Sequence, residues 1–106
     1  MVEIFRTNPD TNEMIKQDSF EKGCWINLTQ PTADELQYVE TSLGILPNFL
    51  RDPLDEEEQP RIDVEEDQTL IIVDTPFIFT ETDDKVYETI PLGILVTDEY
   101  IITISS

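Results

Sequence analysis

Two long segments in the C-terminal third limit the possible folds more than any other feature of this sequence. Residues 69–79 and 86–96 are rich in isoleucine, leucine, valine and phenylalanine, which are frequent in strands. Residues 82–85 between them have the composition of a turn, and a second polar turn at 97–99 leads into an apolar segment at 100–104. We therefore predict three consecutive strands joined by short turns, as in an antiparallel sheet.

The first long segment is apolar at consecutive positions from residue 69 to 73, rather than at alternate positions. A strand that is apolar on both faces is expected to lie in the centre of a sheet that is covered on both sides. Pro76 lacks the N–H that a strand ladder needs, so we expect a bulge or a strand end there. We also expect irregularities in the second strand at Pro91 and Gly93.

Shorter strands are predicted elsewhere in the chain. Residues 2–5, 14–16 and 24–28 have strand composition, and the turn residues between the first two suggest a hairpin. Ile62 and Val64 alternate with acidic residues, which predicts a half-exposed strand.

The strongest local signal is a helix at residues 32–43. Thr32 and Glu35 have the spacing of a capping box, in which each residue's side chain binds the other's backbone N–H. Leu36, Val39 and Leu43 are expected to form its buried stripe. Gly44 is expected to end the helix as its C-terminal cap. Pro47 is expected to begin a second, short helix that buries Phe49 and Leu50.

The predicted order is three strands, two helices and four strands. Because the helices are grouped between the strands, the pattern favours a mixed α+β fold over a doubly wound parallel sheet. We predict a mixed, largely antiparallel β-sheet with the helices packed on it. A length of 106 residues predicts a single domain.

The charge balance excludes several functions. There are 24 acidic residues, 6 basic residues and no histidine, which give a net charge of -18. Such a charge repels phosphate backbones, so we expect no nucleic-acid partner. Without histidine, the Ser-His-Asp and Cys-His catalytic arrangements are absent, and we do not expect an enzyme. The acidity indicates divalent-cation binding, a basic protein partner, or only a role in solubility.

The densest acidic cluster lies at residues 52–58. It lacks the Asp-x-Asp-x-Asp-Gly spacing of a calcium-binding EF-hand loop. Mg²⁺ keeps most of its water and often needs only one or two protein carboxylates, so a sparse magnesium site is possible here. A solvated acidic loop is the alternative.

Five motifs suggest a family. In chain order they are "WINLT" at 25–29, "LGI" at 43–45, "PNFLRDPLD" at 47–55, "QPRID" at 59–63 and "YIITI" at 100–104. From about residue 24 to residue 106, this ordered set resembles the amino-terminal cytoplasmic domain of the CorA family of magnesium transporters. Gln59 differs from the usual residue before the proline, and Asp63 stands at the usual glutamate position. The family's stalk helix, transmembrane helices and Gly-Met-Asn signature have no counterpart in this sequence, so we expect the cytoplasmic domain alone.

The resemblance implies a regulatory sensor on the cytoplasmic side of the cell membrane. In this family the cytoplasmic domains form a ring, usually a pentamer, and Mg²⁺ bound between neighbouring domains favours the closed channel. The aspartate of the family's "L-x-D-x-L" segment contributes to that site and corresponds to Asp52. Asp55 is a second metal-ligand candidate because it lies nearby. The partners implied are the protein's own stalk and transmembrane regions.

Two expectations remain open at this point. The isolated chain is expected to be a monomer, because its net charge of -18 opposes self-association and the stalk and membrane segments are absent. It is expected to bind Mg²⁺ weakly, because the ligand that the family's stalk helix supplies is absent. The alternative function is a freestanding acidic module that binds a basic protein surface.

Overall fold

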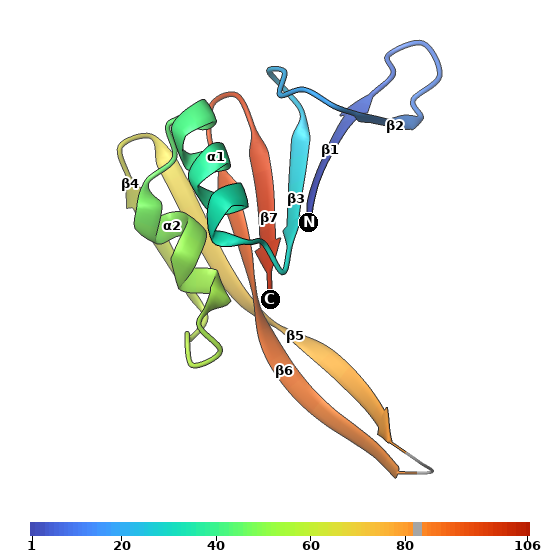
Figure 1. Ribbon diagram of the computed structural model, residues 1–106, viewed down its shortest axis with the longest axis vertical. Coiled ribbons are helices and arrows are strands. Elements are labelled where there is room, and N and C mark those ends of the chain that lie inside the picture. The colour runs from blue at the N-terminus through green and yellow to red at the C-terminus, as the bar shows by residue number, and fades with distance from the viewer. Residues whose placement is uncertain (82–83) are drawn as a thin grey trace.

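The computed structural model describes the backbone of residues 1–81 and 84–106, and the side chains of residues 1–76 and 88–106. Seven strands form one sheet in the order β2-β1-β3-β7-β6-β5-β4 (Figure 1). The strands are β1 (Val2–Thr7), β2 (Met14–Gln17), β3 (Trp25–Thr29), β4 (Arg61–Glu65), β5 (Gln68–Glu81), β6 (Asp84–Val96) and β7 (Ile101–Ser105). The helices are α1 (Ala33–Leu43), α2 (Pro47–Arg51) and the short 3₁₀ helix η1 (Asp52–Leu54).

The sheet is mixed and largely antiparallel, which confirms the predicted fold class. β3 and β7 are parallel, and every other described pair of neighbouring strands is antiparallel. The parallel pair joins the N-terminal strands to the C-terminal strands. Side chains reinforce it, because Trp25 Nε1 donates to Thr103 Oγ1 at 2.9 Å and Thr103 Oγ1 donates to Asn27 Oδ1 at 2.7 Å.

Helix α1 has the ends that its sequence predicts. The Glu35 N–H donates to Thr32 Oγ1 at 3.1 Å, and the Thr32 N–H donates to Glu35 Oε1 at 2.9 Å, which completes the capping box. Gly44 ends the helix with a φ of 67°, in the left-handed region that favours glycine. Leu36 and Val39 are buried, whereas Leu43 is half-buried at the edge of the core. No helix in the described part of the chain is both long and apolar enough to cross a membrane.

The capping box makes the stability of the domain depend on pH. The pKa of the Glu35 carboxyl lies below its ordinary value, first because it accepts the Thr32 backbone N–H and second because the amino group of Met1 bonds to it. A lowered folded pKa stabilises the domain above the unfolded pKa, and this contribution is lost as the pH falls through the folded pKa. Glu35→Gln should therefore lower the melting temperature at pH 7, and the difference from the unsubstituted chain should shrink below about pH 4.

The control for this prediction is Glu56→Gln in the exposed acidic connector. That change also removes one negative charge, but it lies outside the capping box. It should leave the melting temperature at pH 7 unchanged or raise it slightly, because it reduces repulsion in a chain of net charge -18. Melting curves from pH 3 to 8 that are the same for the two variants would contradict the role given to Glu35.

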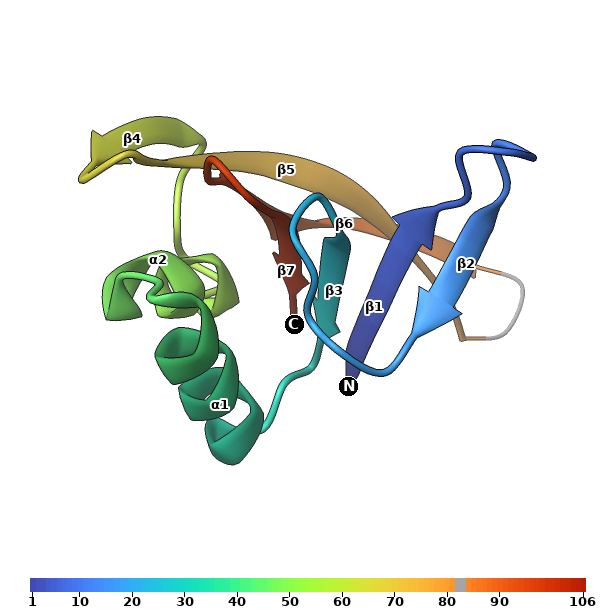
Figure 2. The ribbon, with the colours of Figure 1, turned by 90° about the horizontal axis from the view of Figure 1, so that it is seen from above.

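Both helices pack on the same face of the sheet (Figure 2). The strand residues on that face are buried; they are Ile4, Ile26, Leu28, Leu70, Ile72, Leu95, Ile102 and Ile104. No described element covers the opposite face, where several apolar side chains are exposed. Exposed fractions there are 67% for Ile62, 72% for Val64 and 48% for Ile101. The expectation of a sheet covered on both sides is therefore wrong for the described residues, because both helices occupy one side.

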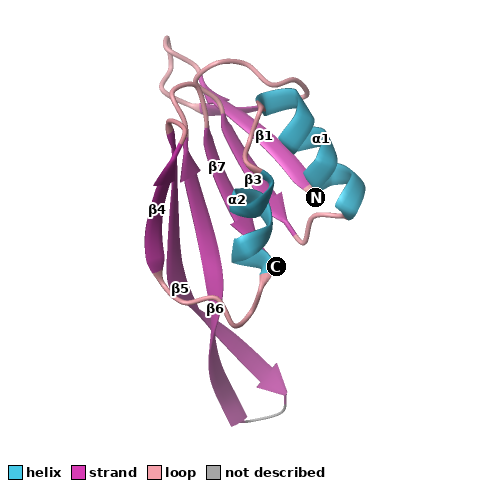
Figure 3. Cartoon of the chain, turned by 90° about the vertical axis from the view of Figure 1, so that its left-hand side faces the viewer, coloured by secondary structure: helices cyan, strands magenta, loops and turns pink. Residues whose placement is uncertain are grey.

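The two prolines of the long strands do not interrupt them. β5 and β6 continue beyond the rest of the sheet as a two-stranded arm (Figure 3). Within the arm, Pro76 is opposite Thr89 and Pro91 is opposite Asp74 in continuous register, so the expected bulge or break is absent there. The described part of each arm strand pairs only with the other, so a missing N–H can point away from the pairing. The predicted turn at 82–85 includes residues 82 and 83, which lie outside the described residues.

Gly93 has a packing role rather than an irregular backbone. It lies within β6, directly beneath the buried ring of Pro53 in η1. A Cβ atom at position 93 would lie 2.4 Å from Pro53 Cγ and 2.7 Å from Pro53 Cβ. Only glycine therefore allows η1 to approach the sheet this closely, and this contact fixes the position of the residue before Pro53.

Candidate functional site

Asp52, the first predicted metal ligand, lies where α2 passes into η1. The segment is anchored on both sides, because Phe49 and Leu50 of α2 and Pro53 of η1 are buried. The Asp52 backbone N–H donates to the carbonyl oxygen of Asn48 and so continues the turn of α2. The Asp52 side chain is 36% exposed, so its carboxylate lies at the surface on a fixed backbone.

The Asp52 carboxylate is paired with Arg61, the first residue of β4. Arg61 Nη2 donates to Asp52 Oδ2 at 2.8 Å, and Arg61 Nε donates to Asp63 Oδ2 at 2.7 Å. Arg61 Nη1 donates to both carboxylate oxygens of Glu58. A single guanidinium therefore binds three carboxylates, which we call the Arg61 cluster: Asp52, Glu58, Arg61 and Asp63.

The Arg61 cluster places one positive charge among three carboxylates. The hydrogen bonds to Glu58 and then to Asp63 raise the pKa of the Arg61 guanidinium above its ordinary value, so it stays charged at every relevant pH. Hydrogen bonds between charged partners are shorter and stronger than neutral ones. The side chains are partly exposed, so water screens part of this attraction. The cluster therefore has a permanent internal cation and an excess of negative charge.

Asp55, the second predicted ligand, is not part of this cluster. Its backbone N–H donates to the Asp52 carbonyl oxygen at 3.1 Å, which closes η1. Its exposed carboxylate accepts the N–H of Glu57 at 3.0 Å and so stabilises the turn that follows. The structure therefore brings Asp52 together with Glu58 and Asp63, and places Asp55 in a separate turn.

These residues do not make a complete Mg²⁺ site by themselves. Among the residues that the structure describes, no three acidic or cysteine side chains are arranged to hold a metal ion. Three carboxylates do converge in the Arg61 cluster, but the guanidinium lies between them. Carboxylate oxygens are suitable ligands for Mg²⁺, so Asp52 could supply one ligand to a site that is completed from outside this chain.

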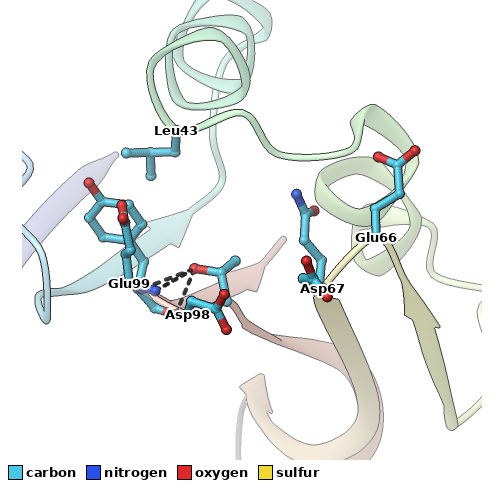
Figure 4. Close-up of a pocket in the computed structure, with 8 residues that line it drawn as sticks. Leu43, Glu66, Asp67, Asp98 and Glu99 are labelled. Atoms are coloured by element: carbon cyan, nitrogen blue, oxygen red, sulfur yellow. Dashed lines mark hydrogen bonds between the residues drawn. The ribbon is translucent and has the colours of Figure 1, made fainter.

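A second acidic region lies at the other end of the sheet, in an open pocket of about 200 Å³ (Figure 4). Glu66 and Asp67 come from the β4–β5 turn, with φ values of 49° and 66°, and Asp98 and Glu99 come from the β6–β7 turn. Figure 4 shows these carboxylates pointing in different directions around the pocket. They do not converge on one point, and we call these four residues the acidic reference region.

The sequence motif predicts Asp52 as a site residue but does not predict its partner, Arg61. Arg61 and Asp63 are two residues apart on a strand, so they lie on the same face. That spacing was visible in "QPRID", but alternation alone does not say which face meets the sheet's helices. Arg61 and Asp63 face η1, and Ile62 and Val64 face the open side.

Comparison with a protein-family description gives a match over most of the chain. The family described as "CorA-like Mg2+ transporter protein" matches residues 20–106. The curated cobalt/magnesium transport protein CorA of Methanocaldococcus jannaschii is 35% identical over 82 residues, which are 77% of this chain and 24% of that protein.

Two solved structures from the same organism share the fold. The complete CorA magnesium transporter matches 98% of this chain with a TM-score of 0.77 and 29% identity, over 32% of its own chain. The soluble domain of that CorA also matches 98% of this chain with a TM-score of 0.77, at 27% identity and over 40% of its own chain. The structural match therefore includes β1 and β2, which precede the family match, and this chain spans well under half of each relative.

Proposed function

Because the chain belongs to the family of CorA-like Mg²⁺ transporter proteins, we propose that it is the cytoplasmic regulatory domain of a magnesium transporter. The observation that carries the proposal is the agreement of 98% of the chain with the soluble domain of CorA. The proposed role is regulation rather than catalysis, since the family is described as a transporter family. This agreement favours the proposal over the freestanding acidic module that the net charge alone leaves open.

The uncovered face of the sheet supports a place within a larger protein. Ile62, Val64 and Ile101 are exposed there, beside Val96, which is 38% exposed. Soluble monomers rarely expose large contiguous apolar patches. This chain spans 40% of the solved soluble domain of CorA, so that relative has further chain available for packing. We propose that the stalk region of the full-length protein covers this face, on the cytoplasmic side of the membrane.

The proposed regulation depends on Asp52. In a pentameric ring, partly exposed Asp52 would face a neighbouring subunit and supply one carboxylate to a Mg²⁺ ion shared between them. Each domain of net charge -18 repels its neighbours, and an ion that binds the closed ring more tightly than the open one shifts the equilibrium toward the closed ring. Mg²⁺ thus acts as a regulatory ligand through its differential affinity for the closed and open states.

The test is the Mg²⁺ dependence of closure in the full-length protein carrying Asp52→Asn. The substitution keeps the size of the side chain and removes its charge. It should raise the Mg²⁺ concentration for half-closure at least fivefold, the lower end of typical coupling between sites, without abolishing transport. Flux into proteoliposomes at graded internal Mg²⁺ measures this midpoint.

The matched control is Asp98→Asn in the β6–β7 turn, which removes one negative charge at the other end of the sheet. It should leave the midpoint within about twofold of the unsubstituted protein. Equal midpoints for the two variants would reject Asp52 as a regulatory ligand.

A further inference from the structure

Arg61 joins three segments of the chain at the proposed regulatory residue. Asp52 lies in η1, Glu58 in the connector that follows, and Asp63 on β4. The Asp52 contact of 2.8 Å and the Asp63 contact of 2.7 Å involve different nitrogens of the same guanidinium. The two outer carboxylates therefore hold the guanidinium in place against Asp52.

We propose that Arg61 is an internal counter-cation that competes with divalent cations for the carboxylate of Asp52. This inference rests on the proposed function, because it names what controls access to the same carboxylate. Asp52 Oδ2 accepts a hydrogen bond from Arg61, so an ion that uses this oxygen must displace the guanidinium. An ion that approaches the other oxygen meets repulsion from a fixed positive charge close by. Arg61 thereby sets the cation concentration at which Asp52 responds.

The position of Asp52 does not depend on Arg61 alone. The Pro53 ring packs on Gly93, and the Asp52 N–H is bonded to the Asn48 carbonyl oxygen. Replacing Arg61 should therefore leave the Asp52 backbone where it is while removing the only positive charge from the Arg61 cluster. Binding and folding effects can then be measured separately.

Arg51 offers a matched control. It is the neighbour of Asp52 in the sequence, and it carries the same charge as Arg61. Its Nη1 donates to Glu40 at 2.9 Å and to the Pro47 carbonyl oxygen at 3.2 Å. Arg51→Gln thus changes the net charge near Asp52 as much as Arg61→Gln does, without removing the contact to the Asp52 carboxylate.

The experiment is a Mg²⁺ titration of the 106-residue chain, followed by the amide NMR signals of residues 52–54, at about 0.15 M salt. Arg61→Gln should lower the half-saturating Mg²⁺ concentration at least threefold. The decrease in Arg51→Gln should be less than half of the decrease in Arg61→Gln. If Arg61→Gln does not fold, Arg61→Lys replaces it, because lysine keeps the charge but cannot bind three carboxylates in a fork. Arg61→Lys should then produce a smaller decrease of the same sign.

Equal effects of the Arg61 and Arg51 substitutions would overturn the inference, because the change in net charge alone would then explain the change in Mg²⁺ affinity. The Asp52→Asn variant distinguishes a failure of this inference from a failure of the proposed function. If Asp52→Asn abolishes the response and Arg61→Gln does not strengthen it, the proposed function stands and the competition is rejected. If only the Arg61→Gln chain responds at Asp52, the competition is supported and the regulatory role of Asp52 in the natural sequence is rejected. No response at Asp52 in any variant rejects both.

Discussion

Gly93→Ala is expected to lower the free energy of unfolding by about 2–3 kcal/mol, the upper part of the usual range for overpacking. The added Cβ would lie 2.4 Å from Pro53 Cγ and 2.7 Å from Pro53 Cβ, which are atoms of a rigid, buried ring. Relief of the clash requires η1 to move away from β6. Because Asp52 begins η1, the same movement should weaken its contact with Arg61. Urea unfolding followed by Trp25 fluorescence measures the loss.

Gly44→Ala is the control for this prediction. Gly44 has a φ of 67°, and a Cβ there would meet no atom within 4 Å, so the change introduces backbone strain without a clash. A left-handed conformation costs a non-glycine residue about 1–2 kcal/mol. Gly93→Ala should cost more than Gly44→Ala, and the reverse order would contradict the close packing of Pro53 on β6.

Leu50→Ala is expected to lower the free energy of unfolding by about 2–5 kcal/mol. Leu50 is 0% exposed and belongs to α2, the helix that leads into η1. Removing three side-chain carbons there leaves a cavity beneath the segment that carries Asp52. Leu43→Ala is the comparison, because Leu43 lies half-buried at the end of α1 and should cost less. The same unfolding assay measures both, and equal losses would show that α2 is not anchored through Leu50.

The elements that the sequence predicts well are defined by nearby residues. The limits of α1 follow from Thr32, Glu35 and Gly44, which act within one turn of the helix ends. The β6–β7 turn is likewise local. The parallel pairing of β3 with β7 is not, since Trp25 and Thr103 are 78 residues apart, and only the complete sheet brings them together. Strand composition predicts that strands form but not which strands become neighbours.

In the candidate site, too, the sequence predicts the local feature but not the contact between distant segments. The motif around Asp52 could be recognised from the sequence, but its contact with Arg61 depends on which way β4 faces. Ile62 and Val64 are apolar and would ordinarily be placed toward the core. They face the open side instead, and the polar residues of β4 meet η1. This orientation is explained if the open face is itself an interior surface in the full-length protein, as proposed above.

We expect Mg²⁺ to act through the region around Asp52, and a Mg²⁺ titration of this chain observed by amide NMR is the decisive experiment. The region should respond weakly, in roughly the millimolar range expected for a sparse, water-rich site. Amides of residues 52–58, which include five acidic residues, should shift at lower Mg²⁺ than those of the reference turns at 66–67 and 98–99, which include two each. Asp52→Asn should remove this preference. Simultaneous shifts at all three acidic regions, unchanged by Asp52→Asn, would contradict the claim and reduce the acidic charge to a diffuse counterion atmosphere.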